Sequence, residues 1–177
     1  MQIERDGVVL ELTRGDITRQ EDMEAVVNAA NRRLTTGGGV AGAIHRAAGP
    51  GLEKEARPLA PIEPGEAVIT GGHDLPNPWV IHCLGPVYGE DEPADRLLAS
   101  CYREALRLAE EKGLDSVAFP AISTGAFGYP VDEAARVALE TVMEAAPELE
   151  SVRRIRWVLW GEEAYEAHRR VLEGWAG

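Results

Sequence analysis

The sequence predicts an α/β fold, a sandwich built on a mixed sheet, from three observations. Short apolar runs alternate with longer segments whose apolar residues recur at helical spacing, which is typical of a sheet covered by helices. The dipeptide Asp6-Gly7 joins two alternating segments, as in a β-hairpin with a type I′ turn, and such a hairpin makes part of the sheet antiparallel. The length of 177 residues suits one domain with a full core, residues 1–177.

The expected elements start with this hairpin and end in a helix. The hairpin strands are expected at 2–5 and 8–13, and further strands, each a short apolar run, at 25–28, 67–70, 79–84, 117–119 and 155–160. Helices are expected at 42–48, 93–112, 131–146 and 162–175. In the second of these, Pro93 suits the first turn and Gly113 can end the helix.

Composition and charge limit the possible partners. The formal net charge is −12, so the chain should repel the nucleic-acid backbone, and no long nucleic acid is expected as a partner. No run of about 18 apolar residues appears, so no membrane span is expected. The charged N-terminal segment is unlike a secretory signal. Two cysteines, Cys83 and Cys101, make no disulfide framework, which favours a reduced, cytoplasmic location.

The histidine and serine patterns predict neither a metal site nor a serine nucleophile. His73, His82 and His168 are scattered, with no C-x-x-C or H-x-x-x-H spacing. His82 and Cys83 are adjacent on a predicted strand and so point to opposite faces. Ser123 lacks the G-x-S-x-G context of a nucleophile elbow. We therefore expect no metal and no bound cofactor.

Two glycine loops, each followed by a predicted helix, are the strongest indication of a ligand site. The first, at 37–42, has three consecutive glycines that permit positive φ and close approach of a ligand to the backbone. The second lies at 121–130. A helix N-terminus attracts anions through free N–H groups, and the second loop can add a concave array of donors. Two such loops can grip a diphosphate; the alternative is that both are ordinary turns between core elements.

The first loop also has the spacing G-x-G-x-x-G, but its context does not fit a dinucleotide-binding fold. That fingerprint lies directly between a strand and a helix, with an acidic residue about 20 residues further on. Here the segment NRRLTT separates the predicted strand from the glycines. The segment about 20 residues on, RPLAPIEPG, is too rich in proline for a central strand. A nicotinamide or flavin enzyme is therefore not favoured.

Six motifs in this order resemble those of the macrodomain family, close to its MacroD-type subgroup. They are GDIT (15–18), VVNAAN (26–31), GGGVAGAIHRAAGP (37–50), GEAVITGG (65–72), VIHCLGP (80–86) and FPAISTGAFGYP (119–130). They extend over nearly the whole chain, and the ordered set is far more specific than any single motif. The resemblance implies a three-layer α/β/α sandwich, with a central mixed sheet, that binds ADP-ribose.

The resemblance also implies how each motif holds ADP-ribose. Asp16 accepts a hydrogen bond from the adenine 6-amino group, which suits an acceptor-only carboxylate, and the Ile17 backbone reads the ring edge. Trp160 stacks on adenine, and Phe127 lies against the distal ribose. The glycine loops hold the diphosphate through Gly38, Gly39, Val40, Ala41, Gly42, Ser123, Thr124, Gly125 and Ala126. Structural roles remain as alternatives: a turn or helix cap for Asp16, and packing for the two aromatic residues.

Two asparagines and one histidine are implied near the reactive end of the ligand. Asn31 contacts the distal ribose hydroxyls and orients the reactive end, because an amide both donates and accepts. Asn28 belongs to the same ligand-binding motif, and His45 faces the distal ribose. Asn31 and His45 are therefore the candidate catalytic residues. The alternatives are that the asparagines cap the turn after the strand and that His45 is structural.

The resemblance implies a reaction, and one residue of this chain departs from the sequence pattern of the enzymes that catalyse it. Enzymes of this family remove ADP-ribose from acidic side chains of proteins and hydrolyse O-acetyl-ADP-ribose. The resemblance therefore implies ADP-ribose, ADP-ribosylated protein and O-acetyl-ADP-ribose as partners. The chain is expected to be a monomer. MacroD-type enzymes carry an aspartate, in GGGVDG, where this chain has Ala41. One interpretation is a hydrolase in which Asn31, His45 and the ligand's own diphosphate hold the water. The other is a reader domain that binds ADP-ribose without turnover.

Overall fold

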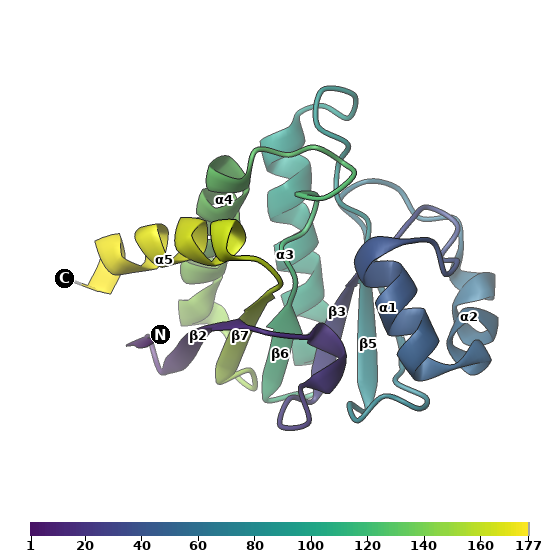
Figure 1. Ribbon diagram of the computed structural model, residues 1–177. Helices are drawn as coiled ribbons and strands as arrows, with labels where there is room; N and C mark the ends of the chain where they lie inside the picture. The colour runs from purple at the N-terminus through teal and green to yellow at the C-terminus, as the bar shows by residue number, and fades with distance from the viewer. Residues whose placement is uncertain (177) are drawn as a thin grey trace.

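The computed structural model describes residues 1–176 and shows a seven-stranded sheet with helices on both faces (Figure 1). The strands are β1 (Gln2–Arg5), β2 (Val8–Arg14), β3 (Ala25–Ala29), β4 (Ala67–Gly71), β5 (Trp79–Cys83), β6 (Ser116–Phe119) and β7 (Arg154–Leu159). The α-helices are α1 (Gly39–Ala48), α2 (Pro50–Ala56), α3 (Ala94–Glu111), α4 (Val131–Ala145) and α5 (Glu162–Ala176). Short 3₁₀ helices are η1 (Ile17–Arg19), η2 (Arg57–Leu59) and η3 (Ala146–Glu148).

The N-terminal hairpin forms as the sequence predicts. β1 and β2 pair in antiparallel fashion, with Arg5 opposite Val8. Asp6 and Gly7 between them have φ values of 53° and 77°. Positive φ at both central residues defines the type I′ turn, whose twist matches that of the flanking strands.

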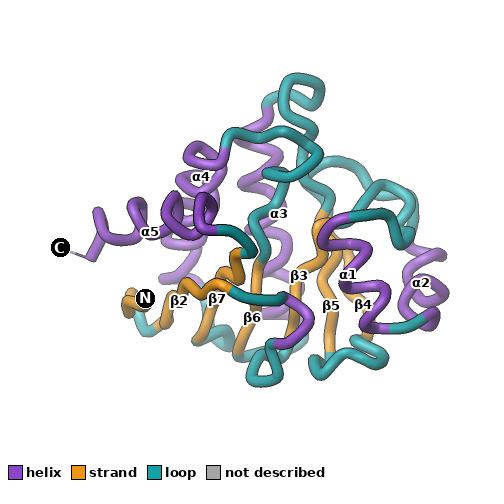
Figure 2. Tube along the Cα trace, viewed as in Figure 1, coloured by secondary structure: helices purple, strands orange, loops and turns teal. Residues whose placement is uncertain are grey.

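The sheet is mixed, with the strand order β1-β2-β7-β6-β3-β5-β4. The pairs β2·β7, β7·β6, β6·β3 and β3·β5 are parallel, whereas β1 and β4 pair in antiparallel fashion at the two edges. Because parallel strands run in one direction, the carboxyl ends of β2, β7, β6, β3 and β5 meet at one edge of the sheet. The loops after β3 and β6, teal in Figure 2, leave the strands at this edge.

Successive residues of the central strands enter two different cores. On one face, Val27 of β3 and Trp157 of β7 pack in the main core with α3, α4 and α5. On the other face, Val26 of β3 packs with Ile44 of α1 and Leu52 of α2. Figure 1 shows α1 and α2 together at the right of the view and the other helices at its centre and left. These layers confirm the predicted three-layer α/β/α sandwich.

The structure differs from the sequence prediction mainly around the first glycine loop. Helix α1 begins at Gly39 rather than at residue 42, because Gly38 already has the extended conformation of an N-cap. Helix α2 was not predicted; it starts at Pro50, whose fixed φ is accommodated in a first helical turn. Gly49, with a φ of 83°, makes the bend between the two helices. The strand predicted at 79–84 ends at Cys83, and the one predicted at 155–160 covers Arg154–Leu159.

A polar cluster is buried between the sheet and α1. His82 of β5 lies between Asn28 of β3 and Thr70 of β4, with its Nδ1 3.1 Å from the Asn28 amide nitrogen and its Nε2 2.9 Å from the Thr70 hydroxyl. The ring of His45, on α1, has its centroid 6.4 Å from that of His82. Burial, together with the neighbouring His45, lowers the pKa of His82 to about 3, and burial also lowers the pKa of His45. Both rings therefore sit in the fold as neutral imidazoles.

This burial predicts a loss of stability in mildly acidic solution. The folded pKa of His82, about 3, lies below the ordinary histidine value of 6.5, so the unfolded chain binds the proton first. The contribution is complete above the unfolded pKa and is lost as the pH falls toward the folded pKa. Between about pH 6.5 and pH 5, before most carboxylates titrate, the free energy of unfolding should fall by up to about 1.4 kcal/mol per pH unit for each such histidine.

Urea unfolding of the wild type and of His82→Gln across this pH range measures the effect. The variant should show a shallower pH dependence because the titrating ring is gone. His73→Gln is the control, since His73 lies at the surface, with its Nε2 2.7 Å from a carboxylate oxygen of Glu55. Equal slopes for His82→Gln and the wild type would contradict the assignment.

Candidate functional site

A cavity of about 330 Å³ opens at the sheet edge where the carboxyl ends of the parallel strands meet. Its walls come from three segments that are far apart in the sequence. They are the end of β3 with the first glycine loop (29–31 and 37–41), Gly85 after β5, and the second glycine loop (121–123 and 125–127). In open α/β sheets this edge is where ligands bind. Both predicted loops therefore face the same space.

The first loop presents unpaired backbone donors to the cavity. Gly38 is the N-cap of α1, and the first helical hydrogen bond is donated by the Gly42 N–H to the Gly38 carbonyl, at 3.0 Å. The N–H groups of Gly39, Val40 and Ala41 precede it, so they have no partner within the helix. These three residues line the cavity, where the positive end of the helix dipole favours an anion.

The conformation of the first loop is fixed by two side chains. The side-chain oxygen Oδ1 of Asn31 accepts from the Thr35 N–H at 3.0 Å, and the side-chain nitrogen Nδ2 of Asn31 donates to the Thr35 carbonyl at 3.0 Å. Glu53, on α2, accepts from the Thr36 N–H at 2.9 Å. Asn31 thus closes the turn after β3, the structural alternative considered for it, and it also lines the cavity.

The second loop turns back on itself and leaves other donors free. Ser123 has a φ of 67°, and its hydroxyl donates to the Pro86 carbonyl at 2.9 Å rather than pointing into the cavity. The Tyr129 N–H donates to the Ser123 carbonyl at 2.9 Å. Within residues 1–176, no acceptor pairs with the N–H groups of Gly125 or Ala126, which both line the cavity. This loop can therefore contribute a second anion-binding concavity.

Gly85 is a site residue that the sequence reasoning missed. It lines the cavity between the two loops, and a Cβ placed on it would lie 2.1 Å from the Ser123 hydroxyl oxygen. Glycine is needed here because the second loop packs directly against the backbone that follows β5. A glycine just after a predicted strand was the available signal, but its contact with Ser123 is not local in the sequence.

The predicted adenine-binding residues lie beside the cavity rather than in its lining. The register places Arg14 of β2 opposite Leu159 of β7, so Asp16 and Trp160 both follow the carboxyl ends of neighbouring strands. Trp160 is 83% exposed, which leaves its ring available to stack. Asp16 caps η1, which packs against α1, and Ile17 is buried. Hydrogen bonds from Thr18 hold the pKa of Asp16 below its usual range, so this carboxylate is ionised.

Other predicted site residues also lie outside the cavity lining. His45 and Asn28 are buried in the polar cluster behind α1, so the structure does not place the His45 ring toward the distal part of the cavity. Thr124 turns its hydroxyl back to the Ala121 carbonyl at 2.9 Å. Gly42 uses its N–H within the helix. Phe127 lines the cavity, and its contact with the distal ribose stays a prediction.

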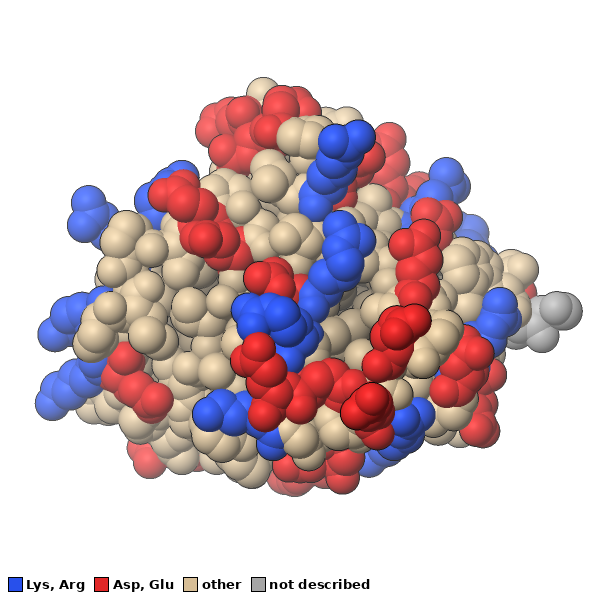
Figure 3. Space-filling model, turned by 180° about the vertical axis from the view of Figure 1, so that it is seen from behind, with Lys and Arg blue, Asp and Glu red and all other residues tan. Residues whose placement is uncertain are grey.

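The cavity lining contains no titratable side chain. Apart from Asn31 and Ser123, it is made of glycine and apolar residues. The protein surface is acidic overall, and Figure 3 shows Asp and Glu side chains gathered at the upper end of the face seen from behind. An anion in this cavity would be held by neutral backbone dipoles instead of lysine or arginine.

The described part of the chain, residues 1–176, contains neither a metal-binding cluster nor a helix that could span a membrane. Among residues 1–176, no group of three or more His, Cys, Asp and Glu side chains is placed to hold a metal ion. No helix in this part of the chain is both long and apolar enough to cross a bilayer.

Comparison with known proteins shows the class to which this fold and cavity belong. The family model described as "Macro domain" matches residues 27–138, and the chain belongs to the macrodomain family. A Macro domain-containing protein of Streptomyces coelicolor is 52% identical over 162 residues, which cover 88% of this chain and 94% of that one. An uncharacterized protein of Fusobacterium nucleatum is 46% identical over 172 residues, covering 93% and 97% of the two chains.

Solved structures of similar proteins include complexes with nucleotides. The Oceanobacillus iheyensis macrodomain with ADP matches with a TM-score of 0.93 and 40% identity, over 99% of this chain and 95% of that one. The Trypanosoma brucei macrodomain in complex with ADP-ribose matches with a TM-score of 0.86 and 38% identity, over 92% and 68% of the two chains.

The contact at Gly85 gives a testable prediction about the second loop. Gly85→Ala would place a methyl group 2.1 Å from the Ser123 hydroxyl and 2.7 Å from the Ile122 side chain, so the loop must shift. We expect the free energy of unfolding to fall by about 1–3 kcal/mol, as in other overpacked sites. Gly125→Ala is the matched control, since its new methyl group meets nothing within 4 Å. Denaturant unfolding measures both, and equal stabilities would refute the close packing.

Proposed function

We propose that the chain binds ADP-ribose in this cavity, with the diphosphate between the two glycine loops. The observation that carries the proposal is the convergence of unpaired N–H groups from residues 39–41 and from Gly125 and Ala126 on one space. Two separate donor arrays suit two linked phosphates better than one. The solved macrodomains with ADP and with ADP-ribose, which share this fold, support the same ligand.

The residues at the two sides of the cavity determine where each end of the ligand is assigned. The adenine is assigned to the side of Asp16 and Trp160, which extend the sheet edge beyond the first loop. The distal ribose is assigned to the side of Phe127 and Asn31. Asn31 lines the cavity while its side-chain amide is held by hydrogen bonds to Thr35, so its position is fixed before the ligand arrives.

The proposed reaction is hydrolysis of the ester bond that links the distal ribose to an acidic protein side chain or to acetate. A water molecule adds to the ester carbonyl, the bond to the ribose oxygen breaks, and a carboxylic acid and free ADP-ribose result. Because the lining offers no titratable group, the acceptor that orients this water is a phosphate oxygen of the ligand. Asn31 positions the ribose. His45 has no direct part in this scheme, because its ring is buried between α1 and the sheet.

The spacing of three positions in a relative indicates which of its residues corresponds to Ala41. The Oceanobacillus iheyensis structures include variants with an asparagine changed to alanine, a glycine to valine and an aspartate to alanine. Those positions are separated by seven and three residues, as Asn31, Gly38 and Ala41 are here. This chain therefore carries, as its own residue, the alanine introduced in that relative.

The absence of a carboxylate at this position favours a second candidate function. A domain that holds ADP-ribose without a group to activate water is a reader of ADP-ribosylated protein. Loss of one water-orienting group slows hydrolysis by about 10²- to 10⁴-fold, so the hydrolase would be a slow one. The two functions differ in turnover and share the binding site.

Binding is tested by placing a charge in the second loop. Gly125→Glu directs a carboxylate into the space assigned to the diphosphate, and nothing in the fold obstructs the new side chain within 4 Å of its Cβ. The Kd for ADP-ribose, measured by calorimetry, should rise by about 100-fold or more because like charges repel at short range. Gly174→Glu, on α5, is the charge-matched control. No heat of binding with the wild type would overturn the proposal.

Turnover is tested with glutamate-linked ADP-ribosylated protein. The wild type should release ADP-ribose slowly, Ala41→Asp should release it faster, and Asn31→Ala should lose release with a smaller loss of binding. Release by Ala41→Asp alone would identify a reader and reject the hydrolase. Rapid release by the wild type would show that the ligand's phosphate suffices as the water acceptor.

A further inference from the structure

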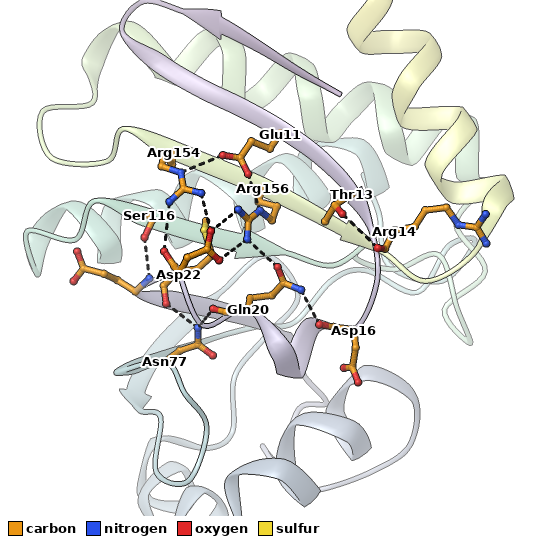
Figure 4. Close-up of polar contacts among 12 residues, drawn as sticks. Glu11, Thr13, Arg14, Asp16, Gln20, Asp22, Asn77, Ser116, Arg154 and Arg156 are labelled. Atoms are coloured by element: carbon orange, nitrogen blue, oxygen red, sulfur yellow. Dashed lines mark hydrogen bonds and ion pairs between the residues drawn. The ribbon is translucent and has the colours of Figure 1, made fainter.

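A chain of polar contacts connects the turn at Asp16, which is assigned to adenine, with a cluster of charged side chains on β2 and β7 (Figure 4). On this face of β2 and β7, Arg154 and Arg156 each pair with Glu11 and with Asp22 from the loop before β3. Nothing in the scheme for binding or hydrolysis uses these residues. Their contacts with the turn at Asp16 suggest what they do.

Asp16 presents one free carboxylate oxygen. Its Oδ1 accepts from the Thr18 N–H at 2.9 Å and from the Thr18 hydroxyl at 2.6 Å. In the part of the chain that the structure describes, its Oδ2 meets only Arg19, at 3.7 Å, on a side chain that is 81% exposed. Oδ2 is thus the oxygen left to accept from an adenine amine, and its direction depends on how firmly the turn is held.

The side chain of Gln20 holds this turn through the main-chain carbonyl of Asp16. The Gln20 amide nitrogen donates to the Asp16 carbonyl at 2.8 Å, and the Gln20 amide oxygen accepts from Arg156 at 2.9 Å. The side chain is only 9% exposed. A carbonyl can only accept and a guanidinium can only donate, so a bridge between them needs a group that does both, as an amide does, and these partners fix the orientation of the amide.

Arg156 is in turn held in place by two carboxylates. It donates to Glu11 at 2.7 Å and to Asp22 at 2.7 and 2.8 Å, and its side chain is only 13% exposed. Glu11 lies directly opposite Arg156 in the register of β2 and β7. The guanidinium is therefore fixed on the sheet, and Gln20 connects it to the main chain of Asp16.

We propose that Gln20 and Arg156 are positioning residues that set the selectivity of the site for a 6-aminopurine. The proposal rests on the proposed binding of ADP-ribose. With the turn held, Asp16 Oδ2 accepts from the 6-amino group and the Ile17 N–H meets the adjacent ring nitrogen. A 6-oxopurine presents an acceptor to Asp16 and a donor to Ile17, so both contacts are mismatched.

The test compares ADP-ribose with its hypoxanthine analogue, inosine diphosphate ribose, by calorimetry. The wild type should prefer ADP-ribose by about tenfold or more, the usual effect of a hydrogen bond to a charged group. Gln20→Glu keeps an acceptor for Arg156 but loses the donor to the Asp16 carbonyl, since an ionised carboxylate only accepts. Its preference should fall below about threefold, while its melting temperature stays near that of the wild type.

Two arginine variants provide the matched comparison. Arg154→Gln and Arg156→Gln each remove a guanidinium that pairs with Glu11 and Asp22, but Arg156 alone contacts Gln20. Arg156→Gln should reduce the preference for ADP-ribose, and Arg154→Gln should leave it at the wild-type ratio. A purely structural role would lower the melting temperatures of both and leave both ratios unchanged.

The outcomes separate this inference from the proposed function. Absence of ADP-ribose binding by the wild type would overturn both. Tight binding of both ligands by the wild type, without preference, would overturn the positioning role alone. A Gln20→Glu variant that keeps the wild-type preference would overturn it as well.

Discussion

The parallel pairing of β2, β7, β6, β3 and β5 is the constraint on which the other features depend. It brings five carboxyl ends to one edge of the sheet, and every segment assigned to the ligand leaves from that edge. Residues as distant in the sequence as Asp16 and Trp160 become neighbours only through this register. The helices on both faces keep the strands buried, so the loops at the edge are the part of the fold free to meet a ligand.

A protein with a net charge of −12 can hold an anion because its donors here are uncharged. Such donors act only when the backbone is held in shape, and side chains do this work from behind the cavity. Asn31 and Glu53 fix the first loop, and Ser123 with Gly85 fixes the second. The polar side chains near the cavity are thus mostly engaged with the protein itself, which explains why so few of them point toward the space they shape.

The sequence predicted most of the fold, because local signals determined it. Asp6-Gly7 specified the hairpin turn, and the apolar runs located each strand to within about one or two residues. What it missed depended on contacts between distant segments. Gly85 is required by Ser123, 38 positions away, and Gln20 meets Arg156 across 136 positions. His45 matched a family motif, but helical spacing alone did not show that its ring would face His82 instead of the cavity.

A binding surface built from main-chain groups has a consequence for how the site can be mapped and how it can change. Truncating Val40 or Thr124 to a methyl group removes no N–H donor, whereas alanine at Gly37 or Gly39 adds a methyl group to a residue with positive φ. The sensitive positions would be those where volume is added. Natural variation should follow the same asymmetry: side chains around the rim can change without removing an N–H donor, whereas a bulky side chain at a glycine such as Gly125 would enter the space assigned to the ligand.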